Sequence, residues 1–345
     1  MKRYIKLFFI LSVIAILFFW FLNNVNFKEV FRIISSVNVI YPVIFVLGVY
    51  SQYYIRAFRW RMILHPHKKG ISILSLYCYT SIGFLLSAII PGKVGEPAKG
   101  ILMAREEHIN PSYGLASVVL ERLIDTLMMF VLLLLSFFVI PTDSNPLLQK
   151  LKTIALFIFP LLIGLFFLFY YLNSEKAFAR VERFIRFACK IIPARARDKA
   201  ISFSLHFVKG LKLDLPLSGY LKLLVTSFIV WLYLIPFYWI LMKGFDFGGR
   251  IGFTETIPYF CTIVASAAIP SPGMAGSFDA VSRHALEGLY RVDTNHAAAY
   301  TILTHFLILI VMTIPGMISF WIKGLHFKTI RNLKGEPGDE RNNKE

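Results

Sequence analysis

The sequence predicts an all-α polytopic membrane protein, and three observations support this prediction. Hydrophobic residues make up 57% of the 345 residues and charged residues only 17%, whereas a soluble domain usually carries about 25% charged residues. Several apolar runs reach the roughly 20 residues that a helix needs to cross the hydrocarbon core. These runs are continuous rather than alternating, which favours membrane helices over a β-barrel.

Eight apolar segments follow one another along the chain: 5–23, 39–55, 71–90, 113–140, 153–172, 219–242, 255–270 and 297–322. The first follows the basic residues Lys2, Arg3 and Lys6, and no small-residue cleavage site comes after it. We therefore expect an uncleaved signal anchor with the N-terminus in the cytoplasm.

The charges of the connecting segments decide which apolar segments cross the membrane. If all eight crossed, the segment 173–218 would lie outside, although it holds ten Lys or Arg against four acidic residues. A segment this basic belongs in the cytoplasm. The conflict disappears if 71–90 is re-entrant. The basic residues after the last apolar segment then lie in the cytoplasm only if 255–270 is re-entrant too, from the opposite face. The prediction is then about six full spans plus two oppositely oriented re-entrant broken helices, in the cell membrane, with both termini in the cytoplasm.

The two predicted re-entrant segments end in the same Pro-Gly-x-x-Gly pattern, formed by Pro91, Gly92 and Gly95 in one and by Pro272, Gly273 and Gly276 in the other. Proline lacks a backbone donor and glycine adopts left-handed conformations, so both interrupt a helix. Matching interruptions in two halves of a chain are typical of the inverted repeats of transporters. Pro-Gly pairs also occur in ordinary loops, which is the alternative interpretation.

We expect a single transmembrane domain over residues 1–325 and a polar cytoplasmic tail over 326–345. The basic cytoplasmic insert 173–218 contains a segment with helical amphipathic spacing, in which one face carries Phe178, Val181, Phe184, Ile185 and Ala188. Because the basic residues lie mostly elsewhere on this helix, we expect it to rest on the inner leaflet.

The half-helix that returns after the first break should point its free N–H groups and its positive dipole end into the protein interior. Such a helix end binds anions. Lys93 and Lys99 flank it, and Glu96 lies in its first turn. The alternative is that the two lysines only extend to the cytoplasmic interface.

The long helix that follows carries Glu121, Arg122 and Asp125 close together. Charges inside a span are costly and usually face the interior of the helix bundle. Arg122 is therefore a candidate for phosphate recognition through its forked guanidinium, with the two acids positioning it. The alternative is a structural ion-pair cluster that holds this helix to the first break.

Around the second break, the candidate residues for lipid binding or translocation are Ser271, Asp279, Arg283 and His305. Asp279 and Arg283 also have the i, i+4 spacing of an ordinary ion pair. His305 is either a satisfied interior histidine or a proton carrier.

Arg56, Arg59 and Arg61 lie at the end of the second apolar segment, where they are candidate topology anchors or headgroup contacts. The net charge of +17 follows from basic segments that face an anionic leaflet, so nucleic acid is not an expected partner. No nucleotide loop, metal-binding spacing or serine motif is found, and the three cysteines show no metal or redox spacing. We therefore predict no catalytic residue, no metal and no cofactor.

Several of these motifs together resemble a known family: residues 91–97 (PGKVGEP), 120–125 (LERLID), 272–276 (PGMAG) and 56–60 (RAFRW). They are similar to the membrane region of lysylphosphatidylglycerol synthases, the flippase-like domain family, over about residues 5–325. The resemblance implies a polytopic domain with two opposed re-entrant elements that moves lipids between leaflets. It also implies that five residues lie at or near the lipid cavity: Lys93, Glu96, Glu121, Arg122 and Asp125. The full-length synthases carry a soluble aminoacyl-transferase domain after this region, whereas this chain stops at Glu345, so we do not expect it to aminoacylate lipid by itself.

The sequence thus favours translocation of an anionic phospholipid or of a lipid-linked intermediate, such as a polyprenyl-linked sugar, between membrane leaflets. The expected partner is an anionic membrane lipid. One alternative is a membrane enzyme or accessory subunit in glycolipid or polyprenyl-phosphate synthesis, and another is a structural partner of a separate lipid-modifying enzyme. Coupling to protons, through His305 or the acids of the long helix, and assembly into a homodimer both stay open.

Overall fold

The computed structural model describes residues 12, 16–90, 94–138, 140, 145–172, 175–267, 269 and 271–325, and over these residues it is helical with no strand. The α-helices are α2 (Phe27–Ser36), α3 (Ile40–Leu64), α4 (Ile73–Ile89), α5 (Gly95–Glu106), α6 (Pro111–Ser136), α7 (Pro146–Leu172), α8 (Glu175–Ala188), α9 (Ala194–Gly210), α10 (Leu217–Leu232), α11 (Ile235–Lys243), α12 (Thr256–Ser266), α13 (Ser277–Tyr290) and α14 (Thr294–Ile322). Short 3-10 turns are η1 (Cys189–Ile191), η2 (Gly248–Arg250) and η3 (Pro272–Met274), and residues 16–22 are also helical. The prediction of an all-α protein is confirmed.

Three helical stretches of the described chain are long and apolar enough to cross a bilayer: Pro146–Gly164 in α7, Leu217–Lys243 over α10 and α11, and Thr294–Ile322, which is α14. α2 and α3, which are bent by 83° relative to each other, form a fourth candidate. α6 is also long enough, with 26 residues, but it carries three charged residues. Helices suited to a membrane are therefore confirmed. The number of six spans stays a prediction, because most of segment 5–23 lies outside the described residues.

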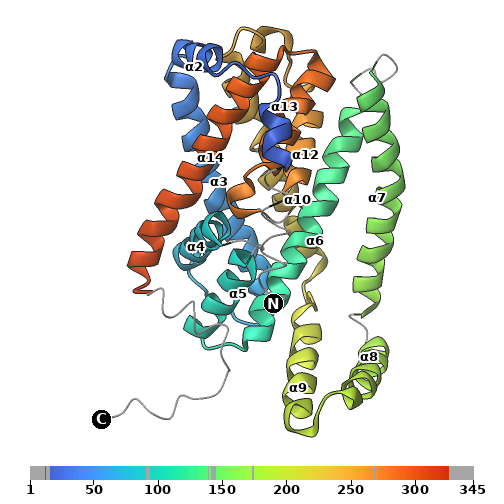
Figure 1. Cartoon of the computed structure of the whole chain (residues 1–345). Helices are drawn as coiled ribbons and strands as arrows, with labels where there is room; N and C mark the ends of the chain where they lie inside the picture. The colour runs from blue at the N-terminus through green and yellow to red at the C-terminus, as the bar shows by residue number, and fades with distance from the viewer. Residues whose placement is uncertain are drawn as a thin grey trace.

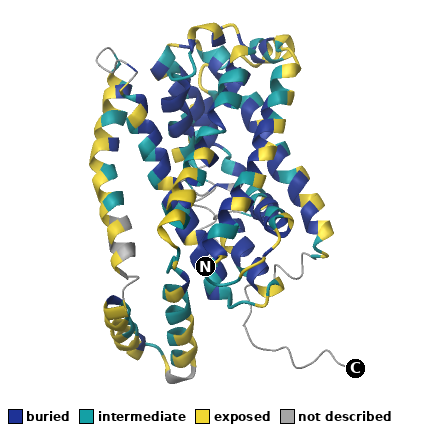
Figure 2. Ribbon diagram, turned by 180° about the vertical axis from the view of Figure 1, so that it is seen from behind, coloured by how far each residue is buried: buried dark blue, intermediate teal, exposed yellow. Residues whose placement is uncertain are grey.

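The outer faces of the long helices expose large apolar side chains. Phe157 on α7 is 78% exposed and Trp321 on α14 is 84% exposed. Figure 2 shows buried residues gathered between the helices and exposed residues on the outer surface, with much of α7 exposed. A continuous apolar exterior of this kind is unfavourable in water but suits a lipid environment.

α4 and α5 form the first hairpin, because they lie side by side with the start of α4 at the end of α5. Ser75, near the start of α4, donates to Glu106 at the end of α5 (Oγ–Oε1 3.2 Å). The two helices approach closely through glycine: a Cβ at Gly95 would lie only 2.1 Å from the carbonyl oxygen of Gly83. The helix therefore ends where the sequence predicts the first break, although Pro91, Gly92 and Lys93 themselves lie outside the described residues.

α12, η3 and α13 form the second hairpin. Gly273 (φ 56), Met274 (φ 63) and Gly276 (φ 77) adopt left-handed conformations between α12 and α13, and glycine reaches this region without steric cost. Tyr290, at the end of α13, donates its hydroxyl to the backbone carbonyl of Glu255, just before α12. The second hairpin thus begins and ends on the same side, and its break lies where the sequence predicts it.

The two hairpins open toward opposite ends of α14 (Figure 1). Lys323, just beyond α14, binds Glu106 at the open end of the first hairpin (Nζ–Oε1 2.5 Å). The second hairpin leads through residues 291–293 into the other end of α14. The breaks themselves meet, because a Cβ at Gly273 would lie 3.4 Å from the carbonyl oxygen of Ala88. Two interrupted helical elements from distant parts of the chain therefore touch in the interior of the bundle.

The basic insert forms α8 and α9, and α9 packs against α6 through Gly210 and Ala116. The expected single apolar face of α8 is divided. Phe178 is half-buried, with Lys209 and Lys212 over its ring at 5.6 and 4.6 Å. Phe184 is 69% exposed. Docking of this insert on the inner leaflet stays a prediction.

Candidate functional site

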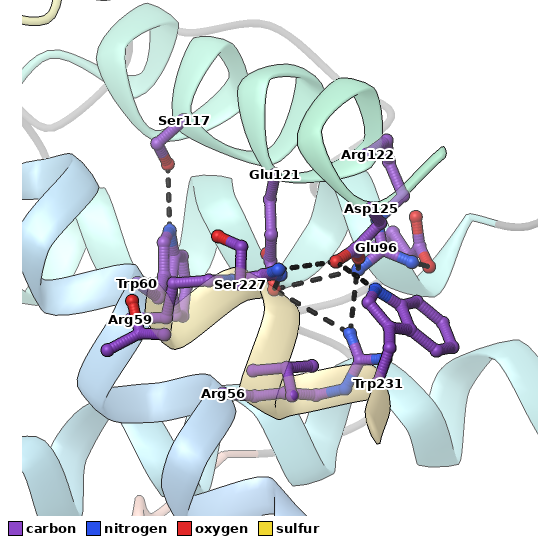
Figure 3. Close-up of polar contacts among 12 residues, drawn as sticks. Arg56, Arg59, Trp60, Glu96, Ser117, Glu121, Arg122, Asp125, Ser227 and Trp231 are labelled. Atoms are coloured by element: carbon purple, nitrogen blue, oxygen red, sulfur yellow. Dashed lines mark hydrogen bonds and ion pairs between the residues drawn. The ribbon is translucent and has the colours of Figure 1, made fainter. Parts of the chain in front are cut away.

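A buried ion network joins α6 to α3, and its acids are Glu121 and Asp125 on α6 (Figure 3). Arg59 on α3 bridges them: one guanidinium nitrogen binds Asp125 Oδ1, and Nη2 lies 3.1 Å from Glu121 Oε1. Arg56 adds a contact of 3.3 Å from Nη1 to Asp125 Oδ2. These four residues are at most 4% exposed. Forked guanidinium groups of this kind bind two carboxylates with defined geometry.

The first hairpin is tied to the same network through Lys99 on α5. Its Nζ lies 2.6 Å from Glu121 Oε2 and 4.6 Å from the centre of the Trp60 ring. Lys99 is 4% exposed, so it does not extend to the interface. The alternative that the sequence left open for Lys99 is therefore wrong. Its ammonium group fixes α5 to α6.

Two tryptophans and an amide add hydrogen bonds in and beside the network, although Arg59 Nε has no partner among the described residues. Trp231 Nε1 donates to Asp125 Oδ1 (2.8 Å), and Trp60 Nε1 donates to Ser117 Oγ (2.9 Å). Gln52 accepts from Arg56 Nε (3.0 Å). Buried charges are tolerated when their donors and acceptors are satisfied in this way.

The network reaches the surface at Arg122 and Glu96, whose side chains are 34% and 25% exposed. Arg122 Nη1 lies 3.0 Å from Glu96 Oε1, and its Nη2 lies 2.7 Å from Asp125 Oδ2. Within the described part of the chain, Arg122 Nε has no hydrogen-bond partner. Arg122 thus connects the buried acids to the first turn of α5, directly beside the first break.

The network holds more positive than negative charge. Four cations, Arg56, Arg59, Lys99 and Arg122, face three carboxylates, Glu96, Glu121 and Asp125, which leaves one positive charge in excess among the described residues. An uncompensated charge in a mostly buried cluster is unfavourable. An anionic group beside Arg122 would compensate it.

The sequence placed Glu96, Lys99, Glu121, Arg122 and Asp125 among the candidate residues for lipid binding, and the structure brings these five together in one network. Arg56 and Arg59, expected at an interface, lie inside the bundle as partners of the acids. Arg61 lies apart, with its guanidinium 5.5 Å from the Phe58 ring. The sequence reasoning missed the tryptophans and Gln52. Gln52, Arg56 and Arg59 follow i, i+4, i+7 spacing on one face of an apolar helix, which could have indicated a buried polar stripe.

Around the second break, Asp279 contacts His305 and not Arg283. Asp279 Oδ2 accepts from the backbone N of Gly276 (2.8 Å), and its Oδ1 lies 2.7 Å from His305 Nδ1. The expected Asp279–Arg283 pair is therefore wrong. The carboxylate caps the first turn of α13, and an adjacent helix supplies the histidine.

Arg283 instead anchors the first helix, whose described part covers residues 16–22. Its Nε donates to Glu287 Oε1 (2.8 Å), and its Nη1 donates to backbone carbonyls that include that of Asn23 (2.9 Å). Ser271 and Ser277 share a hydroxyl contact of 3.1 Å. The described residues contain no group of three or more His, Cys, Asp or Glu that could hold a metal ion.

Comparison with known proteins gives one family. The profile described as lysylphosphatidylglycerol synthase TM region matches residues 6–316. This range contains both hairpins and every residue of the ion network. No curated protein and no solved structure matches the chain.

Proposed function

Since the chain belongs to the lysylphosphatidylglycerol synthase transmembrane-region family, which places it in a membrane in a lipid-related role, we propose that it moves an anionic phospholipid or lipid-linked intermediate between leaflets. The two hairpins are then re-entrant elements that enter the membrane from opposite faces. They form an inverted repeat, and both termini are cytoplasmic. Acyl chains stay in the bilayer while the headgroup passes between the hairpins.

The observation that carries the proposal is the excess positive charge beside the first break. The Arg122 side chain is partly exposed and sits next to the N-terminal turn of α5, while its buried Nε has no hydrogen-bond partner among the described residues. A guanidinium and a helix N-terminus both favour a phosphate group. An anionic headgroup is therefore the ligand that this position recognises best.

The headgroup's path lies between the two hairpins, which open toward opposite ends of α14. Irregular backbone at membrane depth is stable only when protein buries it or when it borders a wet cavity. The breaks touch at Gly273 and Ala88, so this arrangement is the closed one. A headgroup can pass only when the two breaks separate, and the hairpins are then gates that face the two leaflets.

The test is a headgroup-accessibility assay with purified protein in liposomes. Fluorescent phosphatidylglycerol, another anionic lipid, a polyprenyl-phosphate sugar and zwitterionic phosphatidylcholine are each exposed to an impermeant quencher. We expect protein to accelerate quenching of the inner-leaflet pool for at least one anionic lipid, with little effect on phosphatidylcholine. No acceleration with any anionic lipid contradicts the proposal. A chemically altered lipid in the same vesicles, detected by mass spectrometry, would favour the enzyme alternative.

A further inference from the structure

The second break contains a buried pair that the proposed headgroup contact does not use. His305 on α14 is 8% exposed and Asp279 on α13 is 4% exposed. Both ring nitrogens of His305 are engaged: Nδ1 lies 2.7 Å from Asp279 Oδ1, and Nε2 lies 2.7 Å from the backbone oxygen of Gly273.

These two contacts define how many protons the pair holds. A backbone carbonyl accepts hydrogen bonds and cannot donate, and the same is true of an ionised carboxylate. Both contacts are hydrogen bonds only if the pair holds two protons, one on each side of the ring. A neutral imidazole facing an ionised Asp279 has one proton too few, so a nitrogen lone pair would then face one of the two oxygens. One of the two protons is therefore exchangeable: it is present in the closed arrangement and absent when the imidazole is neutral and Asp279 is ionised.

The other described charged residues near His305 and Asp279 bind elsewhere and do not contact this pair. On α13, Arg283 binds Glu287 and the first helix, while His284 stacks on Trp20 at 3.7 Å between ring centres. α4 and residues 271–276 contain no charged residue. On α3, Arg56 and Arg59 belong to the ion network of α6. Phe278 packs beside the His305 ring at 5.1 Å. Within the described chain, Asp279 is the charged partner of His305.

The proton acts where the two hairpins touch. His305 holds the carbonyl of Gly273, the residue that lies against Ala88 of the first hairpin. Asp279 holds the N–H of Gly276, the other left-handed glycine of the break. Removal of the proton breaks one of the contacts that fix this turn in place.

We propose that His305 and Asp279 form a proton-binding site that couples proton binding to closure of the two hairpins, so that each opening releases one proton. This inference rests on the proposed lipid translocation and adds the proton as its coupled ion. The protonated pair holds the breaks together. Loss of the proton from the pair frees the Gly273 turn to separate from Ala88.

The experiment measures lipid translocation at equal pH on both sides of the vesicle, over a pH series, for the wild type and two variants. One proton per opening predicts that the wild-type rate rises about tenfold per pH unit below the midpoint and then levels off. His305→Gln removes the titrating ring, so its rate should be independent of pH. His284→Gln, one turn from Asp279 but outside the pair, should keep the wild-type profile.

A third variant guards against a failure to fold, and a spectroscopic measurement makes the test independent of lipid movement. Asp279→Asn still offers an oxygen to the N–H of Gly276 but takes the counter-charge from His305, so the midpoint should move to lower pH. NMR of nitrogen-15-labelled histidine, with His305→Gln as the assignment control, should show a proton on Nε2 and a second proton in the hydrogen bond between Nδ1 and Asp279 in the closed protein. A wild-type pH profile in His305→Gln, or a pair that holds only one proton at low pH, overturns the proton site. If the wild type moves no lipid while the NMR result holds, the proposed function fails and the proton site remains.

Discussion

The two hairpins share a Pro-Gly-x-x-Gly pattern in the sequence, but different chemistry holds the residues beside each break. Beside the first break, α5 is fixed to α6 through Lys99 and Arg122, in a network of four cations and three carboxylates. The second break is held by backbone contacts and by the pair of His305 and Asp279. The first break is therefore fixed by many permanent charges, whereas the second depends on one removable proton.

Because of this difference, we expect the two hairpins to have different tasks. A network in which most charges have more than one partner keeps its geometry while a ligand arrives, which suits recognition of an anionic headgroup. A turn fixed by a single titratable pair can change its geometry at moderate cost, which suits a gate. The following predictions test this division, beginning with the largest expected effect.

Removal of one acid from the first network should be far more costly than removal of the acid at the second break. Asp125→Ala leaves Arg56 and Arg59 buried with too few partners, a change that costs about 3–5 kcal/mol. Asp279→Ala should cost less, because His305 can lose its proton and become neutral. Thermal unfolding of both variants in detergent measures the difference. An Asp279→Ala variant that is less stable than Asp125→Ala would contradict the division between the hairpins.

The first hairpin should not tolerate a side chain at Gly95. A Cβ there would lie 2.1 Å from Gly83 O and 2.4 Å from Ser87 Oγ, so Gly95→Ala must push α4 and α5 apart. Overpacking of this kind costs about 1–3 kcal/mol. Gly164→Ala is the control, because a Cβ at Gly164 meets nothing within 4 Å. Equal unfolding temperatures for the two variants would exclude a close α4–α5 contact.

At Gly273 in the second break, the backbone conformation rather than the available space limits which residues are tolerated. Gly273 has φ 56, and a Cβ there would approach the flexible end of Leu309 at 3.0 Å. Gly273→Ala should cost about 1–2 kcal/mol because of its left-handed backbone. Gly273→Asn should cost less, because asparagine adopts this conformation more readily. Unfolding measurements that rank Asn as worse than Ala would show that space, and not φ, governs this position.

Arg122→Gln should weaken recognition of the anionic headgroup but leave the stability of the fold nearly unchanged. The side chain is 34% exposed, and Asp125 keeps its contacts to Arg56 and Arg59, so we expect a stability change of at most about 1 kcal/mol. The same substitution removes the excess positive charge and should slow translocation of anionic lipid. Arg32→Gln, at a position 76% exposed on α2, is the matched control in the quenching assay. Undiminished transport by Arg122→Gln would remove this residue from the headgroup site.

The sequence predicted those features that depend on local spacing. The helical class and both breaks follow from apolar runs and Pro-Gly patterns, and the cluster at Glu121, Arg122 and Asp125 follows from spacing on one helix. Partners from distant segments could not be predicted. Arg56 and Arg59 read as interface residues because nothing local shows that α3 packs against α6. Asp279 and Arg283 have the spacing of an ion pair, but the cap of α13 and His305, 26 residues away along the chain, bind the carboxylate instead.

The most direct test of the account is to link the two breaks covalently. A Cβ at Gly273 would lie 3.9 Å from the Cα of Ala88, which is close enough for a disulfide between cysteines at these positions. The native cysteines are buried and unpaired, so the wild type under the same oxidation is the control. We predict that the oxidised Ala88→Cys, Gly273→Cys protein stops moving anionic lipid and that a reductant restores transport. Undiminished lipid movement by the fully cross-linked protein would show that the headgroup does not pass between the hairpins.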